Sequence, residues 1–128
     1  MKLEHNWRYK SLENLEKKVW PKVDYDSHLV TRTSQLRKIP LNEFSVEDLR
    51  IMIGQDIGLD YLIPLALEKL KENILSEGDF YPGDLLVALV HCDPGFWTKN
   101  EGYRRELEEM MRLNAELIIR HELKVKLP

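Results

Sequence analysis

The chain has 128 residues, of which 43% are hydrophobic and 32% are charged, and 22 acids against 19 bases give a formal charge of −3 at pH 7. This length and composition predict one compact domain whose core needs neither disulfides nor a structural metal. The charge balance argues against a protein that grips phosphates nonspecifically, and six Gly with six Pro exclude collagen-like and low-complexity chains.

Three features of the sequence predict a cytoplasmic, soluble protein. Cys92 is the only cysteine, so it has no partner for an internal disulfide, and the four His residues lack zinc-site spacing. The first ten residues lack the apolar core of a signal peptide. The longest apolar runs, 61–67 and 85–90, are far shorter than the roughly 20 residues that span a bilayer. We therefore expect no cofactor, no metal and no membrane contact.

Two helices are predicted in the first 40 residues. Ser11 can cap the first, which stops before Pro21. Asp26 or Ser27 can cap the second, and Pro40 ends it. The side chains expected to face inward from these helices are Leu12, Leu15, Val19, Leu29, Val30, Thr33 and Leu36.

The clearest local signal surrounds Ser45. This residue can cap a helix whose third residue is Asp48, and Phe44 can pack against Leu49 across the helix start. The second turn, residues 51–53, is apolar nearly all round. This pattern is typical of a central helix rather than a surface one.

Gly54 and Gly58 interrupt the helical pattern, which resumes at 59–73. Pro64 must lie in the first turns of this second buried helix or kink it. The segment 77–84 is rich in turn residues, and Pro82 fits the first position of the helix that follows. The next apolar run, 85–90, fits a buried strand or a helix, and the lack of predicted partner strands favours the helix.

The last long segment, 102–122, has the apolar spacing of an amphipathic helix. The alternation of apolar and basic residues in 123–127 favours a short extended tail. The fold class predicted for residues 1–128 is therefore all-α, a single compact domain of five to seven helices.

Charge is unevenly spread along the chain. Residues 1–41 hold nine bases and five acids, residues 85–128 hold seven of each, and residues 42–84 hold ten acids and three bases, a net charge of −7. A patch of one sign steers an oppositely charged partner and sets its orientation. The alternative is that acids such as Asp48 and Asp84 stabilise helix starts.

The sequence contains no combination of residues that strongly predicts a catalytic site. In His91-Cys92-Asp93, neighbouring side chains on a helix point about 100° apart, so a buried Cys92 is expected rather than a nucleophile of a small hydrolase. Asp56 and Asp60 form a pair of carboxylates, but nothing in the sequence indicates a raised pKa. The bases near the N-terminus alternate with acids, which is typical of a solvated helix face rather than a nucleic-acid site. We expect neither an enzyme nor a nucleic-acid-binding protein.

Two stretches, VEDLRIMIGQ at 46–55 and EGDFYPGDLL at 77–86, resemble one helical family of immunity proteins from bacterial contact-dependent growth inhibition (CDI) systems. The similarity extends over about residues 11–97. It implies a cytoplasmic non-enzyme that binds the C-terminal toxin domain of its cognate CDI system and blocks the toxin's active site. Toxin domains of such systems are commonly nucleases, which hold phosphate in basic clefts.

The resemblance and the acidic segment together predict a protein that is a monomer alone and forms a 1:1 complex with its toxin. The candidate partner-binding residues are Glu47, Asp56, Asp60, Tyr61, Glu77, Asp79, Phe80, Tyr81 and Asp84. The alternative is a helical adaptor or regulator that binds another protein through the C-terminal amphipathic helix and its Met110-Met111 pair.

Overall fold

Helices make up the regular secondary structure of the residues that the computed structural model describes, which are 3, 5–21 and 27–128. The α-helices are α1 (Leu12–Glu16), α2 (His28–Leu36), α3 (Val46–Gly54), α4 (Leu59–Glu72), α5 (Asp84–His91), α6 (Pro94–Lys99), α7 (Glu101–Leu113) and α8 (Ala115–Arg120). Two 3-10 turns, η1 (Trp7–Tyr9) and η2 (Leu41–Glu43), precede α1 and α3. The all-α fold class is confirmed.

The helix count exceeds the expected range by one because of short helices. The described part of the chain has eight α-helices, and α1, α6 and α8 have only five or six residues. Helix α6 was not predicted, and the segment 102–122 forms two helices rather than one. Asn114 separates them, with φ −112° and ψ 20°, and its side chain donates a hydrogen bond of 2.8 Å to the carbonyl of Met110.

Serine caps begin three of the helices, as their sequences predict. The Ser45 hydroxyl accepts a hydrogen bond from the Asp48 N–H at 3.1 Å, and the Asp48 carboxylate accepts one from the Ser45 N–H at 3.0 Å. Ser11 forms the same reciprocal box with Asn14, and Ser27 caps α2. The alternative cap, Asp26, lies outside the described residues.

Three inward-facing side chains were predicted wrongly. Helix α1 ends at Lys17, whose left-handed backbone (φ 54°) stops it, so Val19 lies beyond the helix and is 80% exposed. Leu29 and Val30 are exposed on the first turn of α2, and only Leu36 of this helix is fully buried. Helix α2 packs against α3, and its one fully buried side chain lies at its C-terminal end, so its first turn is exposed to solvent.

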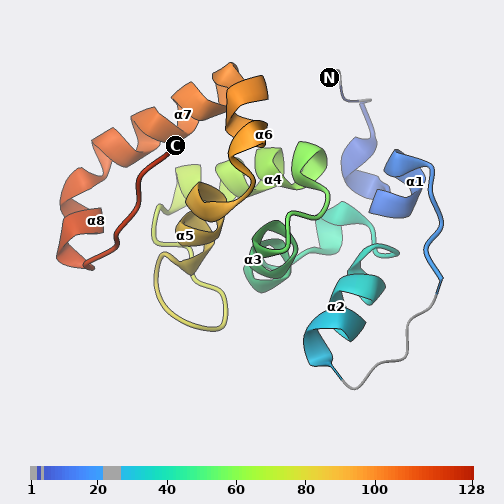
Figure 1. Cartoon of the computed structure of the whole chain (residues 1–128). Coiled ribbons are helices and arrows are strands. Elements are labelled where there is room, and N and C mark those ends of the chain that lie inside the picture. The colour runs from blue at the N-terminus through green and yellow to red at the C-terminus, as the bar shows by residue number, and fades with distance from the viewer. Residues whose placement is uncertain (1–2, 4, 22–26) are drawn as a thin grey trace.

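Helices α3 and α5 lie next to each other at the centre of the molecule (Figure 1), and the contacts at their two ends show that they run in the same direction. Their first turns meet where Arg50 approaches Asp84, and their ends meet where the Asp93 N–H donates to Asp56. Helix α4 packs against α3, α5 and α7. All three residues of 51–53 are buried, so the predicted central position of this helix is confirmed.

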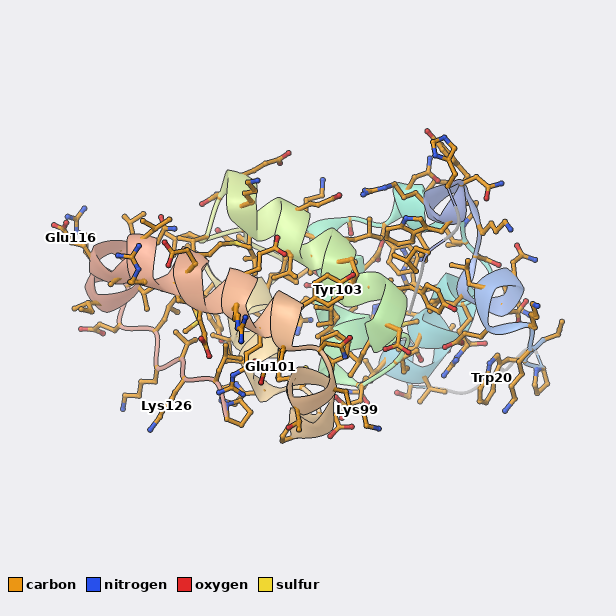
Figure 2. The ribbon with its side chains drawn as sticks, turned by 90° about the horizontal axis from the view of Figure 1, so that it is seen from above. Trp20, Lys99, Glu101, Tyr103, Glu116 and Lys126 are labelled. Atoms are coloured by element: carbon orange, nitrogen blue, oxygen red, sulfur yellow. The ribbon has the colours of Figure 1, made fainter. Side chains whose placement is uncertain are left out.

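The other helices cover the two ends of this centre. Figure 1 shows α1 and α2 on one side of α3 and α5, and α7 and α8 on the other. In the view from above, Trp20 and Glu116 lie at opposite ends of the molecule (Figure 2). The buried apolar side chains nevertheless form one cluster, which includes Trp7 at one end and Ile118 at the other.

Two details around α5 matter for the site. Residues 85–90 are helical, which confirms the choice of helix over strand. Helix α5 begins at Asp84, however, and Gly83 (φ 93°) precedes it, so Pro82 lies before the helix and not at its first position. After α8 the chain turns back as an extended tail, in which Leu127 is buried while Lys124 and Lys126 are exposed.

Candidate functional site

Eight of the nine predicted partner-binding residues fall into two groups at opposite ends of the α3–α5 pair, and Tyr61 belongs to neither. The first group, which we call the loop face, lies beside the first turns of both helices and consists of Glu47, Arg50 and residues 77–84. The second group, which we call the acidic hollow, lies beyond their ends and consists of Glu16, Asp56, Asp60 and Asp93. The nine residues of α3 make a helix roughly 13 Å long, with one group at each end.

The buried side chain of Asp84 orders the backbone of the loop face. Its carboxylate accepts hydrogen bonds from the backbone N–H groups of Gly78 at 2.6 Å, Phe80 at 3.1 Å and Tyr81 at 3.4 Å. The Gly83 N–H donates to the carbonyl of Leu75 at 3.1 Å and closes the loop. Because backbone donors that would otherwise need water meet a fixed carboxylate, the loop is held in one shape.

Arg50 connects the loop to α3. It donates two hydrogen bonds to Glu47, at 2.5 and 2.6 Å, lies 3.8 Å from the Asp84 carboxylate, and places its guanidinium 4.5 Å from the centre of the Phe80 ring. The hydrogen bonds from Arg50 are the main reason that the pKa of Glu47 is lowered, and they raise the pKa of Arg50. Glu47 also accepts a hydrogen bond of 2.8 Å from the Asp79 N–H.

The outer surface of the loop face is aromatic and acidic. Phe80 is 67% exposed and Tyr81 43% exposed, and both Glu77 and Asp79 are exposed beside them. Glu77 and Asp79 form no ion pair with any described residue. A groove of about 490 Å³ adjoins Tyr81 and is lined by Pro82, Val87 and tail residues 121–124.

The acidic hollow has a different character. It has a volume of about 260 Å³, and Lys99 and Phe96 also line it. The Asp56 carboxylate accepts a hydrogen bond of 2.8 Å from the Asp93 N–H. Burial raises the pKa of Glu16. Tyr61 belongs to neither group. Its side chain is half-buried, and its hydroxyl donates a hydrogen bond of 3.4 Å to the carbonyl of Leu15.

The structure adds residues that the sequence prediction missed. Arg50 carried a usable signal, because it follows Glu47 by three residues on a predicted helix. Glu16, Asp93 and the tail residues 121–124 carried none, since they lie far along the chain from the acidic segment. Of the predicted residues, Glu47 and Asp84 are engaged within the loop, while Asp60, Glu77, Asp79, Phe80 and Tyr81 are exposed.

The His91-Cys92-Asp93 sequence does not form a nucleophilic site. Cys92 is buried, as expected, and burial raises the pKa of its thiol to about 11. The His91 ring nitrogen Nδ1 lies 3.0 Å from the carbonyl of Val87 and donates to it rather than activating the thiol. Within residues 3, 5–21 and 27–128, no three His, Cys, Asp or Glu side chains are grouped as a metal site requires.

Comparisons with known proteins place the chain in a family. None of the described helices has the length and apolar character needed to cross a membrane. No curated protein and no solved structure shows significant similarity to the chain. The family model of the CDI immunity proteins, in contrast, matches residues 14–107, which include α2 to α6 and the loop face. The chain therefore belongs to the family of CDI immunity proteins, whose role is to neutralise a toxin.

Proposed function

We propose that this protein binds the C-terminal toxin domain of its own CDI system, that this domain is a nuclease, and that binding covers the nuclease active site. Family membership supports a toxin as partner. The observation that carries the finer proposal is the excess of carboxylates on the segment 42–84, among them the exposed Glu77 and Asp79. A nuclease must hold phosphates in a basic cleft, and carboxylates of an inhibitor complement the same cleft.

The alternative, an adaptor that uses the C-terminal helices, receives less support. Met110 is buried and Met111 is half-buried against the core, so the Met pair offers little adaptable surface. An immunity protein that works by occlusion needs no catalytic group and no cofactor, and the hydrogen bond of His91 and the burial of Cys92 are consistent with this role.

The toxin domain encoded immediately upstream tests the proposal. Co-expression with this chain is expected to restore growth, and the purified pair is expected to elute as a 1:1 complex. Cleavage of RNA or DNA by the purified toxin is expected to stop when the immunity protein is added at equal concentration. If neither rescue nor a complex is obtained with the genuine neighbour, the proposal fails. If the chain restores growth but the purified toxin degrades no nucleic acid, only the proposal that the toxin is a nuclease is contradicted.

A further inference from the structure

We propose that the loop face, and not the acidic hollow, is the surface that docks onto the toxin, with Phe80 as its central anchor and a basic surface of the toxin around its active site as the occupant. This inference rests on the proposed function and selects one of the two ends of the α3–α5 pair. It also extends the docking surface to the groove beside Tyr81.

Exposed apolar area distinguishes the loop face. Phe80 and Tyr81 are neighbours on a short loop, and Phe80 exposes two-thirds of its surface. The energy of protein interfaces is concentrated in such aromatic anchors near the centre of the contact. The acidic hollow has only one aromatic side chain in its lining, Phe96, and this residue is buried.

Rigidity also favours the loop face. The three backbone N–H groups that donate to Asp84, and the Asp79 N–H that donates to Glu47, fix the loop before any partner arrives. The guanidinium of Arg50 lies against one side of the Phe80 ring and limits its orientation. A surface that is already ordered loses less conformational entropy on binding, so more of its contact energy appears as affinity.

Charge identifies the chemistry of the occupant. The loop face holds the carboxylates of Glu47, Glu77, Asp79 and Asp84 against the single cation Arg50, a net charge of −3 among these five groups. An aromatic anchor within an anionic surface fits a basic protein surface that has an apolar recess. The acidic hollow has the same net charge, because four carboxylates and Lys99 line it, so the choice between the two surfaces rests on the exposed aromatic side chains and the ordered loop.

The groove beside Tyr81 enlarges this surface with residues from outside the family match. Val87 and Leu123 form apolar parts of its wall, and His121 and Lys124 lie at the same place. These tail residues follow the matched range 14–107. Contacts between the groove and the toxin would therefore include tail residues that lie outside the part of the chain matched by the family model.

Matched pairs of variants test the choice of face against the purified cognate toxin domain. Phe80→Ala is compared with Tyr9→Ala, which removes a similarly exposed aromatic ring from η1, outside the loop face. Asp79→Lys is compared with Asp60→Lys, which reverses an exposed charge at the acidic hollow. Urea unfolding of each variant establishes that it is folded, and surface plasmon resonance at several salt concentrations gives the rate constants.

We expect Phe80→Ala to raise the Kd by about 30-fold or more, mainly through faster dissociation. Asp79→Lys should slow association by about tenfold and weaken its dependence on salt. Tyr9→Ala and Asp60→Lys should each change the Kd by less than about threefold.

The outcomes separate the two proposals. If the wild-type protein binds the toxin and the loop-face variants bind as well as wild type, or the Asp60 and Tyr9 variants lose more, the docking inference is overturned and the proposed function stands. If the wild-type protein does not bind its neighbour's toxin, the proposed function fails. If Phe80→Ala instead converts a dimer of this chain into a monomer, measured by analytical ultracentrifugation, the loop face is a self-association surface and the inference is wrong.

Discussion

The Oδ1 atom of Asp56 accepts a hydrogen bond of 2.8 Å from the backbone N–H of Asp93, and this bond joins the ends of α3 and α5. At their other ends, the same two helices meet through Arg50 and Asp84. Because the helices are parallel, a single acidic stretch of sequence is divided between two separate surfaces. The polar contacts at each surface differ in kind: at the loop face they order an exposed loop, and at the acidic hollow they fasten the helix ends.

Asp84→Ala should destabilise the protein by about 3 kcal/mol, because three partly buried hydrogen bonds from backbone N–H groups lose their charged acceptor. Asp84→Asn, which retains one acceptor oxygen, should cost about half as much. Asp79→Ala removes an exposed carboxylate from the same loop and should change stability by less than about 0.5 kcal/mol. Urea unfolding measures all three, and equal losses for Asp84→Ala and Asp79→Ala would show that the Asp84 contacts contribute nothing.

Gly83→Ala should destabilise the protein by about 2 kcal/mol. Gly83 has a φ of 93°, which a residue with a Cβ adopts only with strain, and the added methyl group meets the side chain of Leu123. Gly102→Ala is the matched control, because Gly102 lies in α7 and an added Cβ would meet open space. This variant should be more stable than the wild type by about 0.5 to 1 kcal/mol.

The double variant Gly83→Ala/Leu123→Ala separates the two causes. It removes the steric conflict and leaves the backbone strain, so it tests whether the tail is seated against Gly83. Its unfolding free energy should exceed the value expected if the two single losses were added. Strict additivity would mean that Leu123 does not lie against this glycine.

The Glu47–Arg50 pair should make stability fall in acid. The pKa of Glu47 lies below its ordinary value of 4.5 in the folded protein, so the unfolded chain binds this proton first as the pH falls. The contribution of Glu47 is thus fully present above about pH 4.5 and is lost as the pH drops through the folded-state pKa. Glu47→Gln should flatten the dependence of the unfolding free energy on pH below about 5, measured by urea titrations between about pH 3 and 7.

Glu72→Gln provides the control for this pH dependence. Glu72 is exposed at the end of α4 and forms no ion pair with any described residue. The variant should reproduce the wild-type slope in acid. A wild-type slope in Glu47→Gln as well would show that another carboxylate dominates acid unfolding.

Cys92 should react slowly with thiol reagents in the folded state. Its pKa of about 11 lies two units above the ordinary value of 9.0, so the thiolate fraction near pH 8 falls about 100-fold, and burial slows the reagent further. Labelling with a disulfide reagent should be at least about 100-fold faster in urea. Cys92→Ala should still protect cells from the toxin, and loss of protection in a folded Cys92→Ala protein would return the hydrolase interpretation to consideration.

Local signals in the sequence determined the helical class and most helix starts. Ser45 with Asp48 and Ser11 with Asn14 lie within one turn of each other, so their hydrogen bonds require no distant residue. The break at Gly54 to Gly58 also follows from the local sequence, and the helix at 85–90 and the burial of Cys92 agree with the sequence prediction. The two motifs at 46–55 and 77–86 were also sufficient to indicate the family to which the chain belongs.

Only the tertiary structure decided which acids share a surface. Asp56 and Asp93 are 37 positions apart and meet because α3 and α5 are parallel, while Glu47 meets Asp79 across 32 positions for the same reason. The exposure of Val19 and the seating of Leu123 against Gly83 likewise depend on how distant segments pack. Periodicity along a chain records which side of a helix is apolar, but the neighbour that covers it is set by the packing of the whole core.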